Sequence, residues 1–261
     1  LTSDEILVNG ACYEGKKDVD SVDITYFKAA FSSELTDNVD LLLTYHNQSD
    51  EVGGRRAVTN GADYDGNPYA EYDNGSALLE QSERDVSLVS LEVSADLGFA
   101  TLTSNTSQYD HDGNGWRDNT GLWVIRDWYN AWYTGNPRPA SHVEAGFDES
   151  AFVQEFRLMS NNDGDDKFDW IIGAYYMDQE RQTNNFSHLR GLEEYGEACI
   201  ALGNPDGCSS WWVGAETDKD LTYIRDEKFK DMAIFGEFSY HVSDEFTITT
   251  GARWFDNSLK N

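Results

Sequence analysis

Apolar and polar residues alternate along much of the chain, in stretches of about ten residues that end at turn-forming residues. In one such stretch Phe27, Ala29 and Phe31 alternate with Lys28 and Ser32. Successive side chains of a β-strand point to opposite faces of its sheet. The pattern therefore predicts strands that carry one apolar face and one polar face.

The alternating stretches come in pairs, and a short polar turn joins the two members of each pair. The predicted strand pairs lie near residues 22–47, 85–107, 150–180 and 228–256. Long connections join one pair to the next, near residues 48–84, 108–149 and 182–226. Outer-membrane barrels alternate in this way, with short periplasmic turns and long extracellular loops. We therefore predict an all-β fold, an antiparallel up-and-down transmembrane β-barrel segment of about eight strands.

The charged residues of the predicted strands indicate which face looks toward water. Glu155 and Arg157 share one face of their strand, and Glu237 and Arg253 lie on the corresponding faces of the last pair. Charges are tolerated around a hydrated lumen, whereas in a small dry core they would need tight pairing. We therefore expect the apolar face to look outward to lipid and the charged face to surround water.

Composition narrows the classes of function. The chain has 19 Lys and Arg against 48 Asp and Glu, for a formal net charge of −29. This excess of negative charge repels the phosphate backbone of nucleic acids, so we expect no binding to nucleic acid. Aromatic residues make up 13% of the chain, which is too many for a disordered acidic protein. No apolar run approaches the roughly 18–20 residues that a membrane-spanning helix needs.

The ends and the cysteines raise two further expectations. The chain begins at Leu1 and not at a methionine, and at its C-terminal end the strand pattern gives way to polar residues. We therefore expect an excerpt of a longer protein. Cys199 and Cys208 enclose a turn-rich segment that suits a local disulfide bridge, which indicates an oxidising compartment. Cys12 is left over, and its partner could lie outside this chain.

Several strand motifs resemble those of a known family. The hairpin formed by Phe152–Ser160 (FVQEFRLMS) and Phe168–Tyr176 (FDWIIGAYY) resembles one that is common in TonB-dependent receptors. The stretches Ala233–Tyr240 and Phe246–Trp254, joined by a short turn, are similar to the same family. Thr25–Ala30 and, farther along, Ala100–Ser104 resemble its middle strands. The resemblance covers most of the strands and none of the loops.

The resemblance implies an outer-membrane receptor of a Gram-negative bacterium. Such receptors build a barrel of about 22 strands around an N-terminal plug. They import siderophores, vitamin B12, glycans or other scarce nutrients, with energy passed on by the TonB system through the plug. The partners implied are TonB, a small nutrient captured by the outer loops, and outer-membrane lipid. We recognise no plug, no Ton box and no aromatic C-terminal strand, so the resemblance is to a middle segment of the barrel.

One acidic motif is a candidate calcium loop. Asp110, Asp112 and Asn114 occupy its first, third and fifth positions, and Asp118 occupies its ninth. Alternate oxygen-bearing residues of a tight loop can converge on one Ca²⁺. The Glu expected at position 12 is replaced by Gly121. Calcium is thus the only cofactor for which we find a candidate site, and a solvated acidic turn is the alternative.

The long connections also carry candidate ligand-binding residues. The tryptophans that could stack on a sugar or a flat chelate are Trp123, Trp128, Trp132, Trp211 and Trp212. The alternative is that they form small hydrophobic cores of the loops. Arg55 and Arg56 could bind an anionic ligand or could form a solvated loop tip.

We do not expect an enzyme, because the five histidines are scattered and no catalytic motif is present. The leading hypothesis is a segment of an outer-membrane receptor that captures a ligand with its outer loops. One alternative is a secreted or surface β-rich binding or assembly module that has calcium-bearing loops and self-associates through its strand edges. This alternative would be extracellular. A small structural outer-membrane barrel is a further alternative.

Overall fold

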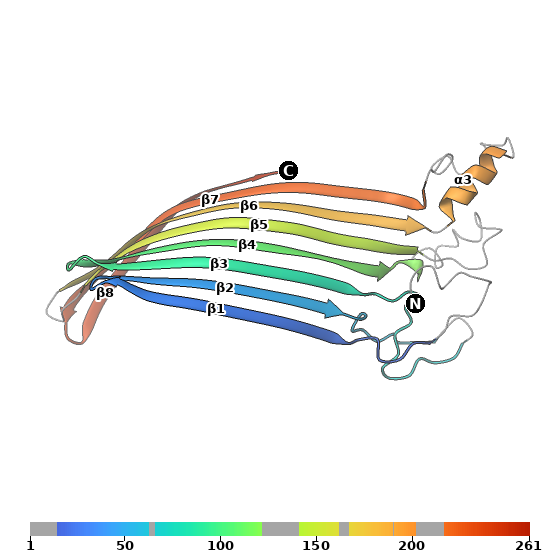
Figure 1. Cartoon of the computed structure of the whole chain (residues 1–261), viewed down its shortest axis with the longest axis horizontal. Helices are drawn as coiled ribbons and strands as arrows, with labels where there is room; N and C mark the ends of the chain where they lie inside the picture. The colour runs from blue at the N-terminus through green and yellow to red at the C-terminus, as the bar shows by residue number, and fades with distance from the viewer. Residues whose placement is uncertain (1–14, 63–65, 122–140, 162–166, 190, 202–216) are drawn as a thin grey trace.

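The computed structural model describes residues 15–62, 66–121, 141–161, 167–189, 191–201 and 217–261 of the chain. Within them, eight antiparallel strands form one sheet in the order β1 to β8 (Figure 1). Each strand pairs with its neighbours in sequence, so the chain runs up and down through the sheet without a crossover. This confirms the predicted all-β, up-and-down architecture.

Short turns join the strands within each pair. The pairs are β1 (Val22–Thr36) with β2 (Val39–Val52), β3 (Ser82–Asp96) with β4 (Ala100–Asp118), β5 (Ser141–Ser160) with β6 (Phe168–Leu189), and β7 (Lys219–Ser243) with β8 (Phe246–Lys260). The long connections meet the opposite end of the sheet, where α3 (Leu192–Ala201) also lies (Figure 1). No helix in the described part of the chain is long and apolar enough to cross a membrane.

The strands reach farther toward the long connections than the residue pattern predicted. β4 continues to Asp118 and β6 to Leu189, whereas the predicted strands stopped near residues 107 and 180. β7 begins at Lys219 instead of near residue 228. Polar residues occupy both faces of these outer ends, so the alternation fades although the backbone pairing continues. The connections are therefore shorter than expected.

Local chemistry explains the short turns. Gly98 has a φ of 85°, a left-handed conformation that glycine adopts at little cost, between β3 and β4. Its N–H donates to Oδ1 of Asp96 over 2.8 Å. In the first turn, the N–H of Asn38 donates to the hydroxyl oxygen of Thr36 over 3.3 Å. These turn bonds favour pairing between strands that are adjacent in sequence.

The register separates the side chains of the sheet into two faces, because directly paired residues of adjacent strands share a face. One face carries two apolar rows, Phe156, Ala174, Ile234 and Trp254, and Leu158, Ile172, Gly236 and Ala252. The opposite face carries Glu155, Arg157, Glu237 and Arg253. The predicted division into an apolar face and a charged face is therefore confirmed.

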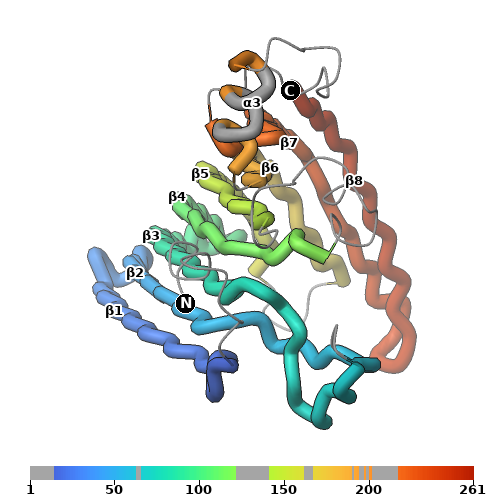
Figure 2. The backbone as a smooth tube through the Cα atoms, turned by 90° about the vertical axis from the view of Figure 1, so that its right-hand side faces the viewer, coloured from blue at the N-terminus to red at the C-terminus, as the bar shows by residue number. Residues whose placement is uncertain are grey.

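The charged face is the concave one. Figure 2 shows the strands following a curved path from β1 to β8. Side chains converge on the concave side of a curved sheet and diverge on the convex side. With the exceptions of Ala100 and Gly146, every buried strand residue lies on the charged face. On the apolar face, Ile234 is 59% exposed and Trp254 is 61% exposed.

The apolar part of the convex face forms a belt at the turn end of the sheet. On β6 it runs from Phe168 to Tyr176, which is about 27 Å along the strand. Aromatic pairs mark its outer border, with Phe152 and Tyr176 6.4 Å apart between ring centres. At its inner border Phe168 and Tyr240 stack at 5.1 Å. For a strand tilted by about 40°, this length along β6 is roughly 20 Å of height, close to the apolar band of about 25 Å of an outer-membrane barrel.

A glycine on the concave face makes room for an aromatic ring. A Cβ atom added at Gly173 would overlap the ring of Phe235, on the adjacent strand. The guanidinium of Arg253 lies 5.8 Å from the centre of that ring and 5.7 Å from that of Tyr175. We therefore expect Gly173→Ala to displace Phe235 and to destabilise the protein by about 1–3 kcal/mol.

The test is a double-mutant cycle of unfolding free energies with Gly173→Ala and Phe235→Leu. In the Phe235→Leu background, the alanine should cost much less, because the ring it displaces is gone. If the two substitutions are additive, the proposed contact does not account for the glycine. A stabilising effect of Gly173→Ala would also contradict the prediction, since a glycine replaced without strain usually gains stability.

Candidate functional site

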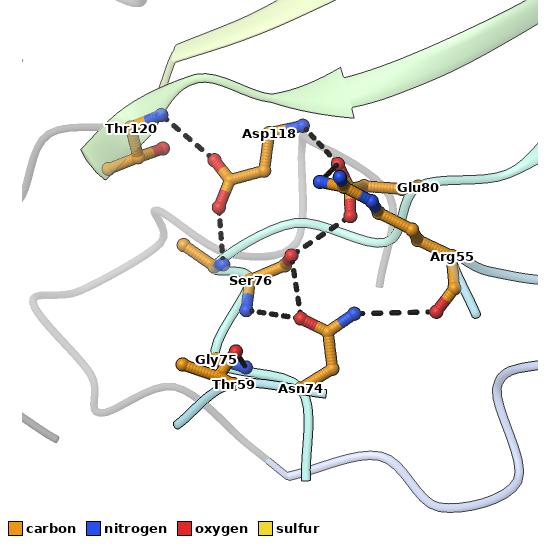
Figure 3. Close-up of polar contacts among 9 residues, drawn as sticks. Arg55, Thr59, Asn74, Gly75, Ser76, Glu80, Asp118 and Thr120 are labelled. Carbon is orange, nitrogen blue, oxygen red and sulfur yellow. Dashed lines mark hydrogen bonds and ion pairs between the residues drawn. The ribbon is translucent and has the colours of Figure 1, made fainter. Parts of the chain in front are cut away.

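The connection between β2 and β3 is held against the end of β4 by hydrogen bonds to two carboxylates (Figure 3). Glu80, only 6% exposed, accepts bonds from the hydroxyl of Ser76 at 2.9 Å and from the N–H of Asp118 at 3.1 Å. Asp118 in turn accepts the N–H of Ala77 at 2.6 Å and the N–H of Thr120 at 3.0 Å. These bonds join two outer segments that are about forty residues apart in sequence.

The same connection is also braced from within. Oδ1 of Asn74 accepts the N–H of Ser76 at 3.0 Å, and its amide nitrogen donates to the carbonyl of Arg55 at 3.4 Å. The N–H of Gly75 donates to the hydroxyl oxygen of Thr59 at 2.8 Å (Figure 3). The loop is therefore shaped by its own polar groups and offers a defined surface at the outer end of the sheet.

Two of the predicted binding residues lie on this loop. A guanidinium nitrogen of Arg55 lies 3.7 Å from Oε1 of Glu80 and the Arg55 side chain remains 64% exposed. Arg56 is exposed and makes no ion pair within the described residues. The loop therefore presents a partly neutralised guanidinium beside an unpaired one. Such a pair could bind an anionic group.

The predicted calcium loop is a strand. Asp110, Asp112, Asn114 and Asp118 all lie on β4, which is paired on both sides by β3 and β5. Alternate residues of a strand are about 6.8 Å apart, so their side chains cannot converge on one ion as those of a tight loop do. The carboxylate of Asp118 already accepts two backbone N–H groups. No group of three potential metal ligands occurs in the part of the chain that the structure describes.

The remaining predicted residues lie largely outside the described residues. This is true of all five candidate tryptophans: Trp123, Trp128, Trp132, Trp211 and Trp212. It is also true of Cys12 and Cys208. The backbone of Cys199 belongs to α3, but its side chain is among those not described. The disulfide and the aromatic ligand surface therefore stay predictions.

A second candidate surface lies on the concave face, outward of the belt, and is called here the inner-wall patch. It consists of Tyr109, His111, Phe147, Glu149, Gln179 and Arg181. The hydroxyl of Tyr109 donates to Glu149 at 2.8 Å and accepts a bond from the amide of Gln179 at 3.1 Å. Arg181 lies 3.6 Å from the same carboxylate and 5.6 Å from the ring centre of Phe147. The patch thus combines aromatic faces, a carboxylate and a guanidinium.

The patch has a measurable electrostatic signature. Burial, followed by the hydrogen bond to Glu149, raises the pKa of Tyr109 from 10.0 to about 12. The neutral phenol therefore contributes stability that is fully present below pH 10 and is lost as the pH rises toward 12. We expect Tyr109 to be among the last tyrosines to ionise in an ultraviolet absorption titration, and Tyr109→Phe to reduce the late step by the absorbance of one tyrosine. An unchanged late step in Tyr109→Phe would contradict this prediction.

The inner-wall patch is not apparent in the sequence, because its members on different strands are about 30–40 residues apart and become neighbours only through strand pairing. The positions of the arginines in the sequence nevertheless indicate this face of the sheet. Every arginine of the strands occupies a concave-face position: Arg84, Arg117, Arg157, Arg181, Arg225 and Arg253. Ion pairs hold several in place. The guanidinium of Arg84, for example, contacts Asp50 and holds the pKa of that carboxyl below its ordinary value.

Comparisons with known proteins bear on the fold alone. The chain matches no described protein family and no curated protein sequence. It does match solved structures. "Structure of the RagAB peptide transporter" gives a TM-score of 0.55 at 12% identity, over 90% of this chain and 28% of that one. The structure of P. aeruginosa FpvA bound to heterologous pyoverdines gives a TM-score of 0.54 at 9% identity, over 92% of this chain and 31% of that one. The structure of the FpvAI–pyocin S2 complex gives a TM-score of 0.55 at 10% identity, over 92% of this chain and 31% of that one.

The chain has the fold of a segment of an outer-membrane-type barrel wall. It spans less than a third of the length of the structures that it matches. The likeness covers the sheet described above, including its up-and-down order.

Proposed function

We propose that the chain is part of a TonB-dependent outer-membrane receptor that takes up a scarce nutrient. The supporting observation is the separation of the two faces of the sheet. The convex face carries the exposed apolar belt, and the concave face carries every strand arginine. A barrel wall between lipid and a hydrated lumen requires this arrangement. A soluble sheet would instead bury its apolar face in a dry core.

Ligand recognition would begin at the outer end and continue along the inner wall. The loop that carries Arg55 and Arg56 is braced into a fixed shape, which lowers the entropy lost on binding. The inner-wall patch offers Arg181 to an anionic group and Tyr109 or Phe147 to an apolar or planar one. The RagAB and FpvA structures concern a peptide transporter and a receptor bound to pyoverdines. Peptides and metal chelates are therefore the first ligands to test.

The test uses the gene in its own host. A deletion strain would be grown with limiting ferric siderophore, cobalamin, oligosaccharide or oligopeptide as the scarce nutrient. Growth should fail on one of them, and deletion of TonB should produce the same failure. Reintroduced wild-type protein should restore growth, whereas Arg181→Ala should reduce uptake about tenfold, the size of one lost charge-assisted bond.

The control for Arg181→Ala is Gln182→Ala, on the same strand and the opposite face. It should restore uptake fully. Unimpaired growth of both deletion strains on every nutrient would contradict the proposal. Recovery of the protein in solution without detergent would favour the alternative, a secreted module whose edges β1 and β8, each paired on one side within the described sheet, bind a second copy.

A further inference from the structure

The convex face has a shallow groove within the apolar belt. Its volume is about 590 Å³, and residues of five strands, β4 to β8, line it. Small residues form its floor, namely Ala174, Gly236 and Ala252. Larger apolar side chains form its walls, among them Phe156, Ile172, Ile234 and Trp254. All of these side chains lie on the convex face, so the groove opens toward the side that would meet lipid.

The cations of the convex face are confined to the two strands that carry the end of this groove. In the strands, the convex-face cations are Lys219, Lys228, Lys230 and Lys260, all on β7 or β8. The outer parts of the other strands present carboxylates on that face, and Asp85, Asp112 and Asp148 lie in direct register. The lysines share their part of this face with Asp178, Glu180, Asp226 and Asp256, so the charges there balance. An anion would therefore meet less repulsion beside these strands than beside the others.

Two of these lysines are placed against each other. Lys228 and Lys260 are directly paired residues of β7 and β8, a position where like charges destabilise a sheet. Lys228 contacts Glu180, and Lys230 lies 2.8 Å from Asp178. Lys260 is exposed and makes no ion pair with any residue that the structure describes. An anion between Lys228 and Lys260 would relieve their repulsion.

The distance between groove and lysines matches one leaflet of a membrane. Gly236 and Lys230 are six residues apart on β7, which is about 20 Å along the strand. For a strand tilted by about 40°, this is roughly 15 Å of height, or half of a hydrocarbon core of about 30 Å. An acyl chain that began at the lysines would thus end in the groove.

We propose that this part of the convex face binds a lipid with a phosphate head group. One acyl chain lies in the groove between Phe156 and Trp254, and the phosphate is held by Lys228, Lys230 and Lys260. This inference rests on the proposed function, because it requires the belt to face a membrane. It assigns the groove to lipid and not to a second copy of the chain, because an anionic ligand satisfies the lysines above it.

The test uses the full-length protein, purified from membranes in detergent. Native mass spectrometry would measure retention of dipalmitoyl phosphatidylglycerol against dipalmitoyl phosphatidylcholine. The wild type should retain the anionic lipid preferentially. Lys260→Gln, which breaks no ion pair, should reduce that preference about fivefold, the contribution of one lysine near an anionic surface. Lys260→Arg should restore it. Ala252→Phe, which fills the groove, should reduce retention of both lipids.

The control is Lys28→Gln, which removes a strand lysine from the concave face and should change nothing. Equal retention of the two lipids by the wild type would overturn the proposal. So would a dimer that forms only when lipid is absent, because it would assign the groove to a second copy. Recovery of the wild type in the membrane fraction reports separately on the proposed function. A protein that inserts but does not discriminate between the lipids refutes the lipid site alone.

Discussion

Replacing Ile234 by lysine is expected to destabilise the protein in a lipid bilayer by about 2–4 kcal/mol. Ile234 lies in the middle of the apolar belt and is 59% exposed on the convex face. If that face meets hydrocarbon, the substitution moves a charge from water into the bilayer without a partner. The measurement is the unfolding free energy of the protein reconstituted in phospholipid vesicles, from denaturant titrations of wild type and variant.

The matched control is Glu237→Lys, which places the same residue type three positions farther along β7. Glu237 is exposed on the concave face. A lysine that faces a hydrated lumen should change the unfolding free energy by less than about 1 kcal/mol. Equal effects of the two substitutions would show that both faces of β7 meet the same medium. That outcome would refute the membrane orientation and the function derived from it.

Replacing Asp118 by alanine is expected to free the β2–β3 connection from the end of β4. The carboxylate accepts the N–H groups of Ala77 and Thr120, and the substitution leaves both donors without their partner. The loss of two bonds to a charged acceptor should lower the local opening free energy by about 2–4 kcal/mol. Hydrogen exchange at the amide of Ala77 measures this directly, because its protection should fall by at least about thirtyfold.

The control is Asp112→Ala, on the same strand. Asp112 is exposed, and it lies opposite Asp85 and Asp148, so its removal relieves repulsion between like charges. It should leave the exchange of Ala77 unchanged and stabilise the sheet by a few tenths of a kcal/mol. If the two aspartates behaved alike, the network in Figure 3 would not be what holds the loop. Added calcium should not restore the Asp118→Ala variant, because Asp118 binds backbone and not a metal.

The two faces of the sheet could be predicted from the sequence because strand geometry makes them a local property. Alternation assigns Phe156 and Arg157 to opposite faces without any knowledge of their partners. Short turns at residues such as Gly98 then determine which strands pair, since neighbours in sequence become neighbours in the sheet. The pairing within each hairpin follows from these two local rules, whereas the pairing of one hairpin with the next is made across a long connection.

The calcium loop shows where local reasoning failed. The spacing of Asp110, Asp112 and Asn114 fits an ion-binding loop as well as it fits one face of a strand. The structure forms the strand because this segment pairs with β3 and β5 on its two sides, and the paired residues are about twenty to forty positions away. The outer ends of β4, β6 and β7 were missed for the same reason, because backbone bonds continue where alternation has faded.

The sequence by itself thus determined the class of fold, the strand pairs joined by short turns and the face on which each strand residue lies, because all three depend on residues close together in the chain. Only the tertiary structure decided which face is concave, how Glu80 and Asp118 hold the outer loop, and which side chains gather around Tyr109 and Lys260. These properties depend on register and curvature, which bring together residues from several strands. No local pattern of side chains specifies that geometry.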